Sequence, residues 1–296
     1  MGFLTKERYG FSGVAHVEIA IMLFFLLLMI PIEPFSSFIK SFLSTPYSAV
    51  MAFLIISGAA LLPDADNLEK DGGSTAVYSL GIVGIILSYV MVTISSVITG
   101  VCHGKKDVTP YTQHRFFWHT MFVPIVMFIM IYFLCPETGK SLIDYFSDIK
   151  ENGIPFAVFI ELFLIGISVY LGTAIFMRYL KKIPLLSFSP FLISIGLMAV
   201  SVLVGGVVAN DIELKRLTYC VALGYTFHLI GDAFADGGIP MLFPISGLWG
   251  HFFMRVKLIP VTVTTGSMLE NLLKIVFLAI DVVLALFVSG ILTKLI

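Results

Sequence analysis

The sequence predicts an all-α integral membrane protein, a polytopic bundle of about seven to eight transmembrane helices. Of its 296 residues, 58% are hydrophobic and only 12% are charged, whereas soluble domains are about 45–50% apolar and about 25% charged. The formal net charge of −1 leaves no excess of basic residues for binding nucleic acid. Soluble and disordered proteins are therefore excluded, and we expect a single transmembrane domain over residues 1–296 that binds no nucleic acid.

The expected spans are apolar stretches of the length that crosses a bilayer, for which a helix needs about 20 residues. The first follows Lys6 and Arg8 but lacks a small-residue cleavage site, so we interpret it as a retained span rather than a signal peptide. The last helix should begin at Ser267, because Ser267 and Glu270 form a capping box. The eight stretches are 12–30, 46–62, 75–99, 116–135, 155–177, 184–208, 217–235 and 271–292.

The path of stretch 75–99 decides which polar groups share a face of the membrane. If all eight stretches cross, the basic residues are divided almost equally between the two sides. If 75–99 is re-entrant or lies flat, twelve of the 18 basic residues fall on the N-terminal side. The positive-inside rule favours this second layout and makes that side cytoplasmic. The layout also brings all the unusual polar groups to the cytoplasmic face.

Two carboxylates end the second stretch, in the sequence Pro63-Asp64-Ala65-Asp66. On an extended turn, carboxylates at positions i and i+2 can point at one cation, and oxygen ligands suit divalent metals. The alternative is a polar helix exit, since Asp is common in turns. Asp64 and Asp66 are therefore candidate metal ligands.

Two histidines flank the start of the fourth stretch. His114 and His119 do not share a helical face, so we expect His114 in the loop and His119 inside the helix. Arg115 lies beside them and would clamp a phosphate or carboxylate. In the alternative interpretation, Arg115 and Trp118 are anchors at the membrane interface.

Three ionisable residues one helical turn apart lie at the end of the seventh stretch: His228 and Asp232 within it, and Asp236 directly after it. Ionisable groups at membrane depth are costly and are usually functional. His228 and Asp232 suit metal ligation, although a structural hydrogen bond between them is the alternative. His16, at the head of the first stretch, joins the candidates through the predicted layout.

Together these residues supply enough nitrogen and oxygen ligands for one or two divalent ions. Mixed histidine and carboxylate ligation suits zinc best, with manganese or iron as alternatives. The predicted metal ligands are His16, Asp64, Asp66, His114, His119, His228 and Asp232.

The order of these motifs resembles the YdjM family of membrane-bound, metal-dependent hydrolases. The shared features are a histidine in the first span, Pro63-Asp64-Ala65-Asp66, a His-Arg and His-Thr block at 114–120, the His228-to-Asp232 helix, Gly238-Ile239-Pro240, and Gly266-Ser267 with Glu270. The resemblance implies a hydrolase in the inner membrane without naming a substrate.

We therefore expect a multi-pass inner-membrane hydrolase with its site at the cytoplasmic ends of its helices. Asp66 or Asp236 would take a proton from the attacking water, and Arg115 would stabilise developing negative charge. The expected substrate is amphiphilic, with a phospholipid or other lipid phosphoester as the simplest candidate. One alternative is a transporter of divalent cations or of a proton-coupled solute that uses the same residues. Another is an assembly protein in which a structural metal has no open coordination position. The oligomeric state is open.

Overall fold

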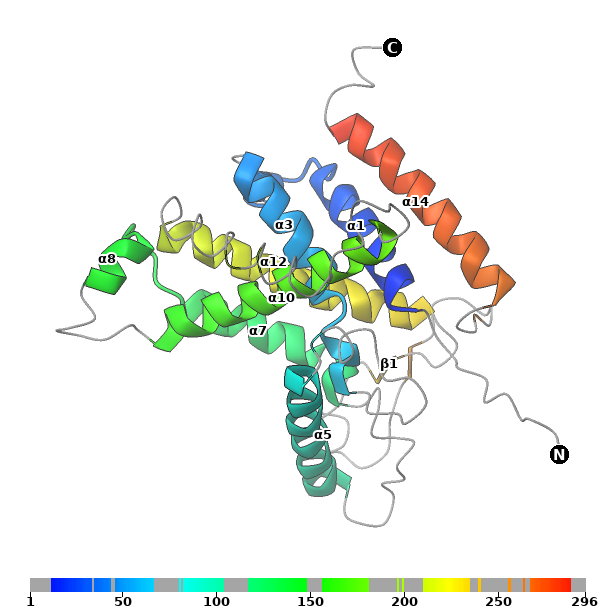
Figure 1. The fold of residues 1–296 in the computed structure, drawn as a ribbon, viewed down its shortest axis with the longest axis horizontal. Coiled ribbons are helices and arrows are strands. Elements are labelled where there is room, and N and C mark those ends of the chain that lie inside the picture. Colours follow the sequence, from blue (N-terminus) through cyan, green and yellow to red (C-terminus); the bar gives the residue numbers. More distant parts are fainter. Residues whose placement is uncertain are drawn as a thin grey trace. The chain divides into compact units, whose positions relative to one another are not determined.

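The structure is a computed structural model, and nearly all of its described elements are helices (Figure 1). The helices are α1 (Gly13–Leu28), α2 (Phe35–Lys40), α3 (Pro46–Ala59), α5 (Ile82–His103), α7 (Phe122–Leu134), α8 (Leu142–Ser147), α10 (Phe156–Leu180), α12 (Asp211–Phe234) and α14 (Met268–Val288). Three 3₁₀ turns are η1 (Ser41–Leu43), η2 (Pro63–Asp66) and η3 (Phe117–His119), and the two-residue strands β1 (Ile239–Pro240) and β2 (Arg255–Val256) pair antiparallel. The described residues are 12–33, 35–43, 46–66, 82–103, 117–147, 156–180, 210–234, 239–240, 255–256 and 267–288, with single positions 80, 196, 199 and 263. The predicted all-α class is confirmed.

The predicted number of transmembrane helices is not confirmed. Within the described ranges, two helices are long and apolar enough to cross a bilayer, Phe156–Met177 and Met268–Val288. A third candidate is the pair Ser37–Leu43 and Tyr47–Ala59, which is bent by 103° and is a broken span or a re-entrant loop. Shorter apolar helices cover Gly13–Leu28, Ile82–Ile98 and Phe122–Leu134. These helices are consistent with multi-pass insertion.

Most of the predicted apolar stretches contain a helix, but several boundaries differ. Stretch 116–135 is divided into the turn η3 and helix α7, and α12 begins six residues before the predicted 217. Stretch 184–208 lies outside the described residues apart from positions 196 and 199. Stretch 75–99 corresponds to α5, which is one continuous helix from Ile82 to His103, so the re-entrant layout stays a prediction.

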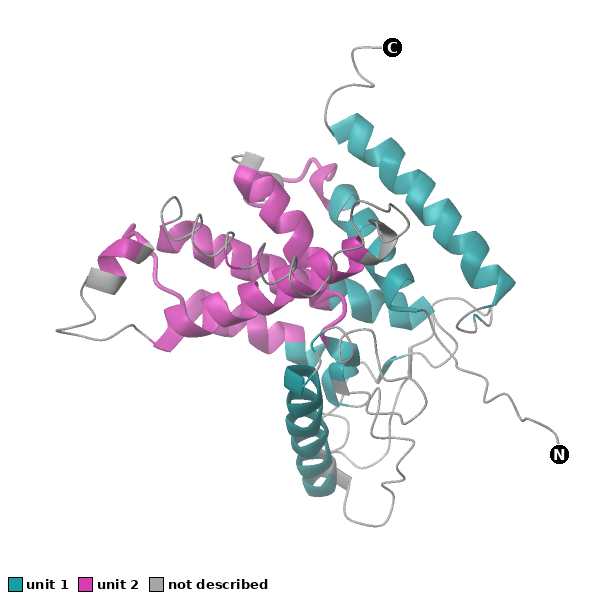
Figure 2. Cartoon of the chain, in the orientation of Figure 1, with its two compact units in different colours: residues 1–26, 63–123, 226–296 teal, residues 27–62, 124–225 magenta. Residues whose placement is uncertain are grey.

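Contacts divide the chain into two compact units, each assembled from separate segments (Figure 2). Unit 1 contains Met1–Leu26, Pro63–Val123 and Thr226–Ile296, and unit 2 contains Leu27–Leu62 and Pro124–Tyr225. Every described residue of the predicted site belongs to unit 1. The expected single domain over 1–296 stays a prediction.

In unit 1, one face of α14 packs while most of its surface is exposed and apolar. Leu273 and Phe277 pack on the buried cluster of Ala15, Ile19 and Val263. The exposed positions include Met268, Leu272 and Ile275, as expected for a helix that contacts lipid.

The start of α14 confirms half of the predicted capping box. The backbone N–H of Glu270 donates to Ser267 Oγ at 3.1 Å. The buried Glu270 carboxylate also accepts the backbone N–H of Ser12 at 2.5 Å, which ties the residue before α1 to the first turn of α14.

In unit 2, helices α3 and α10 approach each other through glycines. A Cβ atom added to Gly58 would lie 1.7 Å from the backbone oxygen of Ser168, and one added to Gly172 would lie 2.2 Å from that of Leu54. Ser168 and Gly172 are spaced as the small residues that allow membrane helices to pack closely. The absence of side chains at Gly58 and Gly172 therefore permits this crossing.

The N-terminus of α12 is held by a buried aspartate. Asp211 accepts hydrogen bonds from the backbone N–H and hydroxyl of Thr138 at 2.7 and 2.6 Å, from Gly139 N–H at 2.7 Å and from the Tyr145 hydroxyl at 3.0 Å. Gly139 adopts a φ of 77°, which favours glycine. Asn210 precedes Asp211 and caps the helix through the N–H of Glu213. These bonds explain why a charged segment begins the helix.

Replacing Asp211 with asparagine should lower the free energy of unfolding by about 2–3 kcal/mol, because hydrogen bonds to a carboxylate are stronger than those to an amide. Burial raises the pKa of Asp211, but the bonds from Thr138, Gly139 and Tyr145 outweigh burial, so its pKa lies below the ordinary 3.8. The stabilisation is thus complete above pH 3.8 and is lost as the pH falls through the lower pKa of the folded protein. Thermal unfolding in detergent should show the difference between the two proteins shrinking at acidic pH. A constant difference would contradict this explanation.

Candidate metal centre

Five ionisable side chains of unit 1 converge from four segments of the chain. We call them the His/Asp cluster. They are His16 on α1, Asp64 on η2, His119 on η3, and His228 and Asp232 on α12. Four of them are fully buried, and the side chain of Asp64 is 16% exposed. Such a concentration of buried imidazoles and carboxylates is the chemistry of a metal site.

Local structure explains how each segment presents its residue. In α12, His228 and Asp232 are one turn apart and therefore share a face. Pro63 starts the 3₁₀ turn that carries Asp64. In η3, the indole N–H of Trp118 donates to the backbone oxygen of Met91 on α5 at 2.8 Å. This bond fixes the residue that immediately precedes His119.

Two imidazole nitrogens of the cluster each lie at nearly equal distances from the same two carboxylate oxygens. His119 Nε2 is 3.4 Å from Asp64 Oδ1 and 3.5 Å from Asp232 Oδ2. His228 Nε2 is 3.7 Å from Asp64 Oδ1 and 3.4 Å from Asp232 Oδ2. Ordinary N–H···O hydrogen bonds are shorter, at about 2.7–3.2 Å. With ligand bonds of about 2.0–2.2 Å, however, a tetrahedral ion separates its ligands by about 3.3–3.6 Å. These four nitrogen–oxygen separations are therefore close to those between two ligands of one tetrahedral ion.

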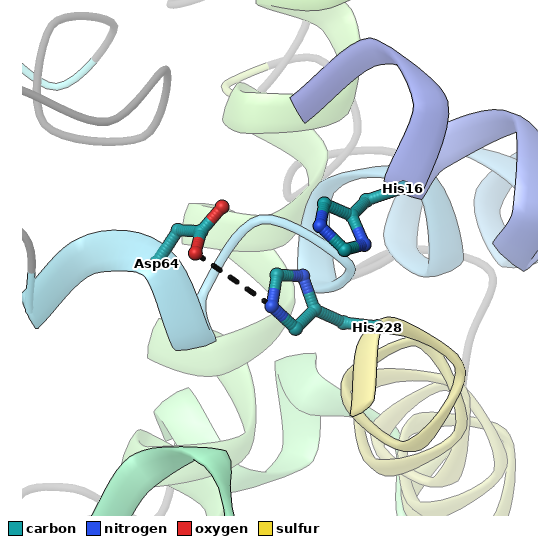
Figure 3. Close-up of side chains that lie close together, drawn as sticks. All are labelled: His16, Asp64 and His228. Atoms are coloured by element: carbon teal, nitrogen blue, oxygen red, sulfur yellow. Dashed lines mark ion pairs between the residues drawn. The ribbon is translucent and has the colours of Figure 1, made fainter. Parts of the chain in front are cut away.

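The fifth residue, His16, lies on the other side of the Asp232 carboxylate. Its Nε2 is 3.5 Å from Asp232 Oδ1, the oxygen that does not face His119 and His228. Its ring stacks on that of His228 with 3.9 Å between centroids. Figure 3 shows the two imidazoles face to face, with Asp64 reaching His228 from η2.

The approach of His16 depends on a glycine between the two ligands of α12. A Cβ atom added to Gly231 would lie 2.9 Å from His16 Nδ1. Sequence reasoning missed this residue. A glycine inside a helix costs about 1 kcal/mol relative to alanine, so its position between His228 and Asp232 was an available sign of close packing.

The electrostatics of the cluster favour an ionised Asp64. Burial raises the pKa of Asp64, but His228, His119 and His16 together outweigh burial, and the pKa lies far below its ordinary value. A bound metal would take the place of the protons on the imidazoles, and the ionised carboxylates of Asp64 and Asp232 would then balance the charge of one divalent ion.

The structure thus brings together five of the seven predicted metal ligands, His16, Asp64, His119, His228 and Asp232. Two overlapping groups of three have ligand atoms that all lie within 4.8 Å of one another: His16, Asp64 and His228, and His119, His228 and Asp232. Asp66 is in η2 beside Asp64, but its side chain is not among those described. His114, Arg115 and Asp236 lie outside the described residues, so their predicted roles stay predictions.

Comparisons with known proteins identify the family. Neither the curated proteins nor the solved structures give a significant match to this sequence. The family model described as YdjM inner membrane protein matches residues 12–295, nearly the whole chain. This match confirms the resemblance predicted from the ordered motifs and places the protein in the inner membrane, in agreement with its apolar helices. The chain belongs to the YdjM inner membrane protein family.

Proposed function

We propose that this protein is a membrane-embedded, metal-dependent hydrolase that cleaves an amphiphilic substrate at the cytoplasmic face. The observation that carries the proposal is the arrangement of His119, His228, Asp64 and Asp232, in which each imidazole Nε2 lies 3.4–3.7 Å from an oxygen of both carboxylates. Mixed nitrogen and oxygen ligation makes zinc the first candidate, with manganese or iron as alternatives. A divalent ion held there would act as a Lewis acid and lower the pKa of a bound water to about 7.

Access to the cluster supports a role for the turn η2. Asp64 is its one member whose side chain is partly exposed, at 16%, while His119 and Asp232 are fully buried. A substrate would therefore approach past Asp64. Asp66 lies two residues further along the same turn, and we propose it as the general base that takes the proton of the attacking water, with Asp236 as the second candidate.

The proposed substrate is a phospholipid or another lipid phosphoester. A divalent metal and a guanidinium both bind phosphoryl oxygens well, and Arg115 would stabilise negative charge as it develops on such an oxygen. An inner-membrane protein also meets amphiphilic molecules directly from the bilayer. The predicted partners are thus membrane lipids.

Elemental analysis of the detergent-solubilised protein, purified without chelators, tests the metal. We expect stoichiometric zinc, manganese or iron in the wild type, and at least about a tenfold loss in Asp64→Ala and in His228→Ala. These two residues are far apart in the sequence, so a shared loss would place them in one site. Asp144→Ala, which removes an exposed aspartate of α8, is the matched control and should retain the metal.

Hydrolysis of a panel of lipid phosphoesters by the metal-loaded protein tests the reaction. The wild type should release product, and both cluster variants should lose this activity together with their metal. Folded wild type without metal would contradict the proposal. Metal-dependent cation flux in liposomes without hydrolysis would instead support the transporter alternative.

A further inference from the structure

We propose that the His/Asp cluster holds two divalent ions, and that Asp232 bridges them with one carboxylate oxygen on each. This inference rests on the proposed metal-dependent function and deepens it. The first position is formed by His119 Nε2, His228 Nε2, Asp64 Oδ1 and Asp232 Oδ2. The second lies at His16.

The two oxygens of Asp232 face different imidazoles at similar distances. Oδ2 is 3.5 Å from His119 Nε2 and 3.4 Å from His228 Nε2, and Oδ1 is 3.5 Å from His16 Nε2. Each separation matches that of two ligands on one tetrahedral ion. The ligand atoms also form two overlapping groups of three rather than one group of five, an arrangement that suits two ions.

A second carboxylate is available to the ion at His16. One ligand atom each of His16, Asp64 and His228 lies within 4.8 Å of the others, as do those of His119, His228 and Asp232. Asp64 can therefore contribute a ligand to the ion at His16 as well as to the ion at the first position. Pairs of catalytic metal ions in proteins lie about 3.5–4 Å apart and share carboxylates in this way.

Charge sets the order in which the two ions bind. Asp64 and Asp232 balance the charge of one divalent ion, so a second would leave about two positive charges at the described ligands. We therefore expect a tight first ion and a weaker second ion. The excess charge would also attract an anionic phosphoester, which agrees with the proposed substrate class and with a two-metal clamp on a phosphoryl group.

Manganese binding to the full-length, metal-depleted protein in detergent tests the inference without measuring activity. We expect two Mn²⁺ per chain in a two-step titration, with an exchange-coupled, multiline electron paramagnetic resonance spectrum once both are bound. His16→Ala should bind one Mn²⁺ per chain, with the spectrum of an isolated ion. Gly231→Ala keeps all five cluster residues but displaces the His16 ring, so it should also lose the weaker ion.

Ile19→Ala is the matched control for both variants. Ile19 is a buried residue one turn after His16, and it too packs near Gly231. Its truncation should cost stability and leave two coupled ions. A single uncoupled ion in the wild type, or two coupled ions in His16→Ala, would overturn the two-ion centre while leaving a metal-dependent hydrolase intact. A wild type that binds no metal would overturn both proposals.

Discussion

Asp232→Asn should abolish metal binding altogether, the largest effect expected from any single substitution in the cluster. Asp232 supplies an oxygen to each side of the centre, 3.4 Å from His228 and 3.5 Å from His16. An amide has the same shape but no negative charge, and one of its two ends is a donor that cannot ligate a cation. We expect the apparent affinity for zinc or manganese to fall by more than about 100-fold. Loss of a residue that only hydrogen-bonds a metal ligand lowers the affinity by about 10–100-fold, so a larger fall indicates direct ligation.

A thermal-shift titration measures this loss independently of elemental analysis. An ion that binds only the folded state raises its stability as the free ion concentration exceeds the Kd. Added metal should therefore raise the Tm of metal-depleted wild type and leave that of Asp232→Asn unchanged. Asp211→Asn is a close control, because it makes the same substitution at another fully buried aspartate of α12. It should lower the Tm but keep the metal response, and a full metal response in Asp232→Asn would refute a bridging role.

Hydropathy predicted where most helices lie because burial in lipid requires continuous apolar surface. It failed at the start of α12, where the charged residues from Asp211 to Arg216 resembled a loop. Those residues are helical because Asn210 caps the helix and Asp211 binds Thr138 and Gly139. The bonds from Thr138 and Gly139 to Asp211 join positions more than 70 residues apart, and no local pattern contains them.

The sequence predicted which residues form the candidate site better than it predicted how their side chains are arranged. The spacing of His228 and Asp232 placed both on one face of a helix, and the rarity of charges in apolar sequence singled out Asp64 and His119. The sequence could not indicate which oxygen of Asp232 faces His16, because that depends on how α1 meets Gly231 in three dimensions. It also gave no sign of the bond from Trp118 to Met91, which holds η3 against α5.

Gly58→Ala should be among the most destabilising substitutions in the protein although it adds a single methyl group. Its Cβ would lie 1.7 Å from the oxygen of Ser168 and 2.7 Å from the nitrogen of Gly172. Both are backbone atoms of α10, so no side chain can rotate away and the two helices must separate. Overpacking costs about 1–3 kcal/mol where neighbours can adjust, and we expect at least about 3 kcal/mol here, or a fall in Tm on the order of 10 °C.

Gly100→Ala separates this steric effect from the general effect of replacing a glycine in a helix. Gly100 lies within α5, and a Cβ atom added there would meet nothing within 4 Å. Alanine favours helix by about 1 kcal/mol over glycine, so the control should be neutral or slightly stabilised. Thermal unfolding of both variants in the same detergent decides the matter. If both variants are equally stable, the packing of α3 on α10 does not depend on the close approach at Gly58. Opposite effects would show that a side chain at position 58 forces the two helices apart.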